Sequence, residues 1–166
     1  MKVYTIKEDF TIDVDASVWL YNIKENELPE YIQFGNISYN FGIYDSNIKS
    51  LRGFPKRCGD MGIKNCPNLR NLDGLGTIQH KLSLTDCSKL TSLKGGPNKS
   101  CAQYYIYCCD SLESLEYVPQ VVGDFRCVDC PKITSLEGLK KVIGELVAVG
   151  CGKSFTNKYL EKLNIE

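Results

Sequence analysis

The clearest candidate for chemistry in this sequence is a pair of cysteines two residues apart, Cys127-Val-Asp-Cys130. Two thiols at this spacing can converge on one zinc ion or form a redox pair. A zinc site needs further ligands, but no second cysteine pair follows at that spacing, and the only histidine is His80. We therefore expect structural roles for both thiols and predict neither a metal nor a cofactor.

Other catalytic patterns are equally incomplete. No serine or cysteine of a recognisable nucleophile motif accompanies His80, so a surface histidine is expected. The run Gly95-Gly-Pro-Asn-Lys-Ser100 lacks the first glycine and the spacing of a phosphate-binding loop, and it suits a bend between strands. The aspartates that could pair are scattered through different repeat positions: Asp60, Asp86, Asp110, Asp124 and Asp129. The sequence predicts that the protein is not an enzyme.

The cysteines belong to a repeat that runs along most of the chain. Pairs of apolar residues three positions apart recur at Ile48/Leu51, Leu69/Leu72, Leu90/Leu93, Leu112/Leu115 and Ile133/Leu136. Successive pairs are 21, 21, 22 and 21 residues apart, a regular period that indicates a solenoid. Three residues before the pairs stand Asp45, Cys66, Cys87, Cys109 and Cys130, and Cys151 continues this ladder column. Five coils are clear, and the column reaches a sixth.

Each coil is expected to open with a short strand. Alternating apolar residues precede the ladder column at Met61/Ile63, Leu82/Leu84, Tyr104/Ile106, Phe125/Cys127 and Leu146/Ala148. Glycine follows the second leucine at Gly53, Gly74, Gly95 and Gly138 and supplies the bend toward the next strand. In this register Cys127 and Cys130 occupy separate packing columns, and Cys58 and Cys101 occupy equivalent turns.

The run Leu82-Ser-Leu-Thr-Asp-Cys-Ser-Lys-Leu-Thr-Ser-Leu93 resembles the core of a leucine-rich repeat. With its 21-residue period and its Thr-Ser-Leu-Glu-Gly and Gly-Asp-Phe-x-Cys elements, the chain is similar over residues 39–153 to the short leucine-rich repeat proteins encoded by tailed bacteriophages. The resemblance implies parallel strands on a concave face, with turns or 3-10 segments on the convex side. Cysteine replaces the asparagine usual in the ladder, and a small, buried thiol can donate weakly to backbone carbonyls there.

The two ends of a solenoid must cover the apolar faces of its outer coils. Residues 1–38 are expected to form an N-terminal β cap and an irregular first coil, in which Phe10–Val14 and Val18–Tyr21 pair as a hairpin and Trp19 is a cap residue. Residues 39–153 carry the repeats. Residues 154–166 are expected to close the stack with a short amphipathic helix, because Phe155, Tyr159 and Leu163 recur every four residues. All three segments form one domain.

The outward positions of the strands are freed from packing, so function is expected there. Three outward columns read Gly62, Ser83, Tyr105, Arg126, Val147; Lys64, Thr85, Tyr107, Val128, Val149; and Asn65, Asp86, Cys108, Asp129, Gly150. Tyr105, Tyr107 and Arg126 are residue types that dominate interface hot spots. Flanked by Lys64, Asp86 and Asp129, they form the predicted partner-binding patch. The alternative is that exposed tyrosines simply suit a β-sheet.

Composition limits the classes of partner. The chain has 166 residues, 43% of them hydrophobic, and its 20 basic residues balance its 20 acidic residues. Without a run of basic residues, nucleic-acid binding is disfavoured. The charged first ten residues do not fit a signal peptide, and no stretch is long and apolar enough for a membrane span. A cytoplasmic protein with reduced, buried cysteines is predicted, located in the host cytoplasm if a phage encodes it.

These observations favour a non-enzymatic module that binds another protein through its concave β-face. If the resemblance to phage proteins holds, the partner is a host or defence protein and the chain is an accessory factor. Two alternatives remain open. The cysteines could bind a metal or a small ligand, or the chain could be a structural accessory protein of a virion.

Overall fold

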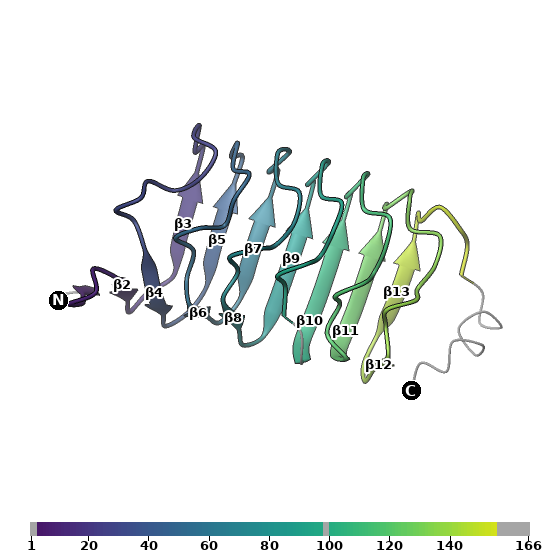
Figure 1. Cartoon of the computed structure of the whole chain (residues 1–166). Helices are drawn as coiled ribbons and strands as arrows, with labels where there is room; N and C mark the ends of the chain where they lie inside the picture. Colours follow the sequence, from purple (N-terminus) through teal and green to yellow (C-terminus); the bar gives the residue numbers. More distant parts are fainter. Residues whose placement is uncertain (1–2, 98–99, 156–166) are drawn as a thin grey trace.

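The computed structural model describes residues 3–97 and 100–155, which form a β-solenoid whose coils follow one another in sequence order (Figure 1). Its main sheet has eight strands in the order β12-β11-β10-β9-β7-β5-β3, with β13 also paired to β11. The strands are β3 (Val18–Tyr21), β5 (Phe41–Tyr44), β7 (Met61–Lys64), β9 (Lys81–Thr85), β10 (Ser100–Tyr107), β11 (Val121–Val128), β12 (Lys141–Val142) and β13 (Leu146–Val149). All of these pairings are parallel. The predicted solenoid of parallel strands is confirmed.

A second, five-stranded sheet was not expected from the sequence. It contains β1 (Tyr4–Ile6), β2 (Ile12–Val14), β4 (Phe34–Ile37), β6 (Arg57–Cys58) and β8 (Thr77–Ile78). In the later coils β10 and β11 are eight residues long, and their first residues pair with each other where earlier coils have a separate short strand. Strands of two residues are too short to show an alternating pattern, so the sequence carries no periodic signal for them.

The core lies inside the coils, as the alternating pattern predicts. The inward strand residues of β7, β9, β10 and β11 are at most 4% exposed, and the paired spine residues from Ile48/Leu51 to Ile133/Leu136 are fully buried. The last predicted pair, Leu146 and Ala148 of β13, is half-buried and packs against this core. Equivalent residues of successive coils thus stack on one another and exclude water.

The cysteine ladder is confirmed, but its first member was wrongly assigned. Because Tyr44 pairs with Lys64, the residue opposite Cys66 is Ser46 and not Asp45. Ser46 Oγ donates to the carbonyl of Tyr44 at 2.7 Å, two residues back. The thiols of Cys66, Cys87, Cys109 and Cys130 each make the equivalent weak bond at 3.5 Å. The error arose because this coil has one residue fewer between the ladder and the spine.

Two rows of left-handed residues turn the chain out of and back toward the main sheet. The first row directly follows the strands and has φ between 51° and 67°: Asn22, Asp45, Asn65, Asp86, Cys108, Asp129 and Gly150. The second row follows the spine and contains Gly53, Gly74, Gly95 and Gly138, with Tyr117 in the remaining coil. At Gly95 a Cβ atom would lie 2.4 Å from the carbonyl oxygen of Leu72 in the preceding coil. The predicted glycine bends are confirmed, and at Gly95 both the backbone angle and the available space require glycine.

The N-terminal hairpin exists, but its strands differ from those predicted. β1 pairs antiparallel with β2, whereas β3 joins the main sheet beside β5. Thus β2 and β3 do not pair as a hairpin, because they lie on the two sheets of the first coil. The C-terminal helix was predicted for residues 154–166, and of these residues 156–166 lie outside the described part of the chain. Within the described part of the chain, no helix is long and apolar enough to cross a bilayer.

Candidate functional site

The outward side chains of the main sheet form two rows, here called the strand face. The registers of the strands place the predicted residues in the expected columns and extend each column toward the N-terminus. The first row reads Trp19, Gly42, Gly62, Ser83, Tyr105, Arg126 and Val147, and the second reads Tyr21, Tyr44, Lys64, Thr85, Tyr107, Val128 and Val149. Rigid, hydrogen-bonded strands therefore present the side chains of each row at a fixed spacing of roughly 4.8 Å from one strand to the next.

Three of the predicted residues form one cluster on β10 and β11. The Arg126 guanidinium lies over the Tyr105 ring, with 5.4 Å from its carbon to the ring centroid. Tyr105 and Tyr107 make an edge contact with 6.1 Å between centroids and 73° between ring planes. Arg126 also forms an ion pair with Glu145, whose hydrogen bond raises the pKa of the guanidinium. The cluster thus holds a cation on an aromatic ring in a defined orientation.

Asp124, on the same strand as Arg126, makes two hydrogen bonds beside this cluster. Asp124 accepts a hydrogen bond from the backbone amide of Glu145 at 2.9 Å and another from the Gln103 side chain at 3.2 Å. These bonds stabilise the carboxylate, and the first of them is the main reason why the pKa of Asp124 is lowered. Burial is the main cause of the raised pKa of Tyr105. The network fixes the segment that carries Glu145, the ion-pair partner of Arg126.

The other three predicted residues lie apart from the cluster. Lys64 is exposed on β7, and β9 separates it from β10. Asp86 and Asp129 follow β9 and β11 and flank Cys108, whose pKa is raised first by burial and then by these two carboxylates. Both aspartates have positive φ, of 55° and 54°. Their backbone position is therefore a sufficient structural reason for their residue type, because aspartate tolerates this conformation well.

A second aromatic cluster at the N-terminal end of the strand face was missed by sequence analysis. Tyr21 stacks on Tyr44 with 5.1 Å between centroids, and Trp19 lies 6.0 Å from Tyr44. Trp19 was expected in a cap, but it occupies the first outward column and is 45% exposed. The alternation Val-Trp-Leu-Tyr matches the later strands and could have revealed this. A Cβ at Gly42 would lie 2.6 Å from the Trp19 ring, so this glycine makes room for the cluster.

A hollow of about 260 Å³ lies on the strand face beside this second cluster. Its floor is built from small side chains, among them Gly62, Ser83 and Thr85, and Trp19 and Tyr44 stand at its margin. Lys81, also in its lining, lies 3.6 Å from the Asp60 carboxylate. The strand face therefore has an aromatic cluster at β3 and β5, a lower stretch over β7 and β9, and the Tyr105 cluster beyond it.

The cysteines occupy structural positions, with two exceptions. Burial raises the pKa of the Cys58 and Cys66 thiols to about 12, which keeps them protonated. Cys108 and Cys151 are only partly buried, and the Cys151 sulfur lies 3.8 Å from that of Cys127. Among the described residues, no group of three or more His, Cys, Asp or Glu side chains is arranged to hold a metal ion. His80 is exposed, with Nδ1 3.9 Å from Asp60.

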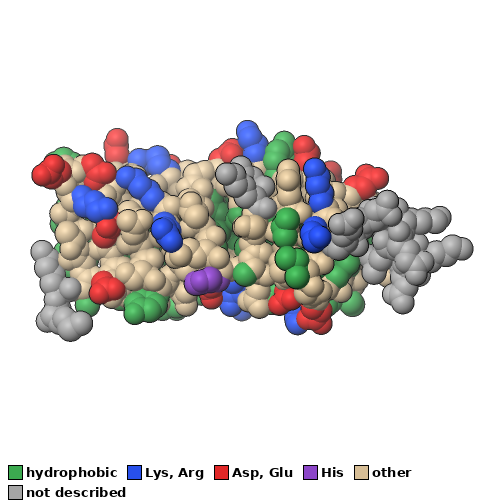
Figure 2. All heavy atoms as spheres, turned by 90° about the horizontal axis from the view of Figure 1, so that it is seen from below, with side chains coloured by type: hydrophobic (Ala, Val, Ile, Leu, Met, Phe, Trp, Pro, Cys, Tyr) green, Lys and Arg blue, Asp and Glu red, His purple; other side chains and the backbone are tan. Residues whose placement is uncertain are grey.

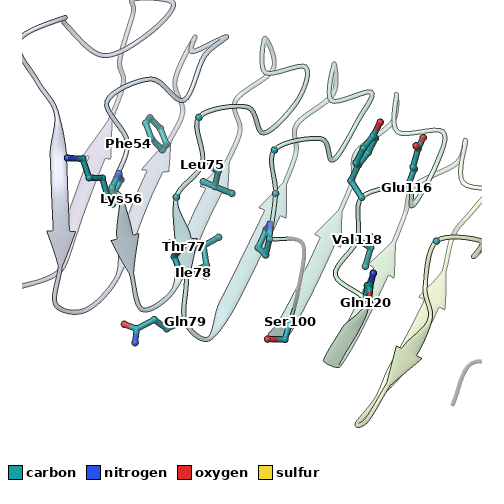
Figure 3. A pocket seen from close by; sticks show the side chains of 18 of the residues that line it. Phe54, Lys56, Leu75, Thr77, Ile78, Gln79, Ser100, Glu116, Val118 and Gln120 are labelled. Carbon is teal, nitrogen blue, oxygen red and sulfur yellow. The ribbon is translucent and has the colours of Figure 1, made fainter.

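The opposite side of the coils carries a larger groove, of about 1240 Å³ (Figure 3). Its lining comes from the bends of successive coils and mixes apolar residues such as Phe54 and Val118 with Lys56 and Glu116. On the face that Figure 2 shows, basic and acidic side chains are interspersed. The described residues that line this groove form no cluster of titratable side chains comparable to the network around Arg126.

The chain was compared with known proteins at the levels of family, sequence and structure. No protein-family model, no curated protein and no solved structure matches it.

Proposed function

We propose that this chain is a non-enzymatic module that binds another protein through the strand face. The observation that carries the proposal is the cluster of Tyr105, Tyr107 and Arg126, in which a guanidinium lies 5.4 Å over a tyrosine ring on neighbouring strands. Tyrosine and arginine dominate the energetics of protein interfaces because they bury large areas and still offer polar groups.

Preorganisation supports the same conclusion. Binding is weakened by the entropy lost when long side chains become ordered, and Arg126 is already held by Glu145 and by Tyr105. Both tyrosines stand on β10, whose backbone is paired with β9 on one side and β11 on the other. A partner surface that meets this cluster therefore orders few additional groups.

The proposed family and the kind of partner follow from the sequence pattern. We place the chain among short leucine-rich repeat proteins of the type encoded by tailed bacteriophages, with the strand face as the concave surface. In this assignment the partner is a host or defence protein met in the host cytoplasm. The 21-residue period and the leucine spine support it, while the cysteines in the ladder depart from the asparagine usual in that family.

The test is affinity capture from a bacterial lysate with the immobilised chain, followed by identification and titration of the captured protein. The variant Tyr105→Ala/Arg126→Ala removes both halves of the cation–π contact and is expected to weaken binding by roughly 30-fold or more, as for hot-spot residues. The matched control Thr77→Ala/Gln79→Ala alters exposed residues that line the groove on the opposite side.

Capture that is equal for wild type and the Tyr105/Arg126 variant would refute the proposal. Equal loss in the control variant would move the binding surface to the groove. Thermal unfolding of both variants, followed by circular dichroism, establishes that each remains folded during the assay.

A further inference from the structure

Three thiols meet where the last described coil stacks on the coil before it. Cys127 belongs to β11, and Cys130 and Cys151 are successive members of the ladder. The Cys151 sulfur lies 3.8 Å from the Cys127 sulfur and 3.6 Å from the Cys127 carbonyl oxygen. Cys130 is the other thiol neighbour of Cys127, and its influence is the first cause of the raised pKa of Cys127. Cys127, which the register treats as a packing residue, thus has two thiol neighbours.

These thiols differ in their access to solvent. Cys127 and Cys130 are fully buried, as are Cys66, Cys87 and Cys109 in the same ladder. Cys151 is only partly buried and is therefore the member of the ladder that a small reagent reaches first. Cys151 is thus the ladder residue that both reaches solvent and contacts a buried thiol.

The surroundings of Cys151 also favour the reactive form of the thiol. A hydrogen bond from Cys127 stabilises the Cys151 thiolate and lowers the pKa of Cys151 to about 7, against the opposing effects of burial and of Asp129. Thiolates, not thiols, attack oxidants, so an appreciable fraction of Cys151 is reactive near neutral pH. At Cys108, the other partly buried cysteine, burial raises the pKa instead.

We propose that Cys151 is a site of oxidation by peroxides and that Cys127 resolves the oxidised form as a disulfide. In the first step the Cys151 thiolate attacks hydrogen peroxide, which is reduced to hydroxide while the sulfur becomes a sulfenic acid. In the second step the Cys127 sulfur attacks this sulfenic sulfur, a Cys127–Cys151 disulfide forms, and water leaves. The chain loses two hydrogen atoms in total.

The fold allows this bond with a small movement. The sulfurs must approach from 3.8 Å to about 2 Å, and the residue that moves is in the partly buried last coil. The bond joins residues 24 positions apart and fastens that coil to β11. Because Cys127 points into the core and Arg126 points outward from the same strand, the oxidation does not depend on the proposed binding function.

The experiment treats the reduced, full-length chain with hydrogen peroxide and measures its intact mass and non-reducing tryptic peptides. Loss of two hydrogens and a link between peptides 127–132 and 142–153 are expected. Peptide 127–132 contains both Cys127 and Cys130, so fragmentation must assign the bond. Iodoacetamide labelling of Cys151 should disappear after oxidation and return after reduction, a readout that requires no variant.

Variants separate the roles of the thiols. Cys151→Ser should abolish the disulfide, and Cys127→Ser should leave a sulfenic acid at residue 151 that dimedone traps. Cys108→Ser, the matched control at another partly buried thiol, should form the disulfide as wild type does. A bond to Cys130, persistence of the disulfide in Cys127→Ser, or oxidation of Cys151 to sulfinic acid without a disulfide in wild type would overturn the proposal.

Discussion

At the scale of single residues, the repeat assigns each side chain a role through its column. The ladder accepts either serine or cysteine, because Ser46 and Cys66 both donate to the carbonyl two residues back. The left-handed row after the strands prefers Asn, Asp or Gly, and Cys108 is its one other residue among the described coils. Residue types are thus explained by local geometry even where they look functional, as at Asp86 and Asp129.

Two buried polar atoms have no hydrogen-bond partner among the described residues, Arg126 Nε and the Tyr104 hydroxyl, and the second lies in the core. Tyr104 is fully buried in the column of Met61 and Leu82, and its ring stacks on Phe125. Its hydroxyl has no hydrogen-bond partner among the described residues. A buried hydroxyl without a partner loses its hydration without compensation.

We therefore expect Tyr104→Phe to raise the free energy of unfolding by about 1 kcal/mol, because it removes only the unpaired hydroxyl. Urea unfolding measured by circular dichroism tests this. Tyr105→Phe, on the outward side of the same strand, is the matched control and should change stability by less than about 0.5 kcal/mol. Destabilisation by Tyr104→Phe would show that the hydroxyl has a partner in solution.

At the scale of elements, the bends after the spine determine how closely the coils stack. Gly138 has φ of 111°, and a Cβ there would lie 2.3 Å from the Leu115 carbonyl oxygen of the preceding coil. Tyr117 occupies the equivalent bend with φ of 71° and is 47% exposed. One position in the row therefore tolerates a side chain, at the cost of a left-handed backbone.

At both bends we expect glycine to give a higher free energy of unfolding than alanine. Gly138→Ala should lower the free energy of unfolding by about 2 kcal/mol or more, because it adds backbone strain and a steric overlap. At Tyr117, the glycine variant should be more stable than the alanine variant by about 1 kcal/mol, since both lose the ring but only glycine relieves the strain. Denaturant unfolding of the three variants measures both effects, and an alanine variant at 117 as stable as the glycine variant would contradict this account.

At the scale of the whole molecule, the ionisable groups limit stability at both ends of the pH range. A hydrogen bond from Thr11 lowers the pKa of Asp9 to about 2, and the pKa values of Glu27 and Glu113 are lowered by Arg52 and Lys132. Carboxyls whose pKa is lowered on folding stabilise the fold above their unfolded pKa and lose this effect as pH falls. Burial raises the pKa of the Cys58 and Cys66 thiols to about 12. These thiols therefore stabilise the fold below their unfolded pKa, and this effect is lost as pH rises.

The melting temperature should therefore be highest between about pH 5 and pH 9, fall from about pH 4 toward pH 2, and fall again above about pH 9. Thermal unfolding across this range, in the presence of a reductant, tests the expectation. Asp124→Asn removes one carboxyl of lowered pKa, so the melting temperature of this variant should fall less steeply between pH 4 and pH 2. A melting temperature at pH 2.5 equal to that at pH 6 would show that these carboxyls do not stabilise the fold.

Much of the fold and part of the candidate site followed from the sequence. The 21-residue period predicted the buried strand pairs, the spine, the cysteine ladder and the outward columns, and it placed Tyr105 beside Arg126. These features repeat in every coil, so each coil supports the register of the next. The N-terminal cluster of Trp19, Tyr21 and Tyr44 was missed because β3 was assigned to a hairpin with β2.

The sequence by itself determined which residues face inward and which face outward. Each coil packs against a similar neighbouring coil, so the same positions are apolar in every repeat. Only the tertiary structure decided that β1, not β3, pairs with β2, that short strands such as β6 and β8 form a second sheet, and that Cys151 meets Cys127. Those features depend on backbone hydrogen bonds and on contacts between neighbouring coils, which almost any side chain permits and which therefore have no periodic signature.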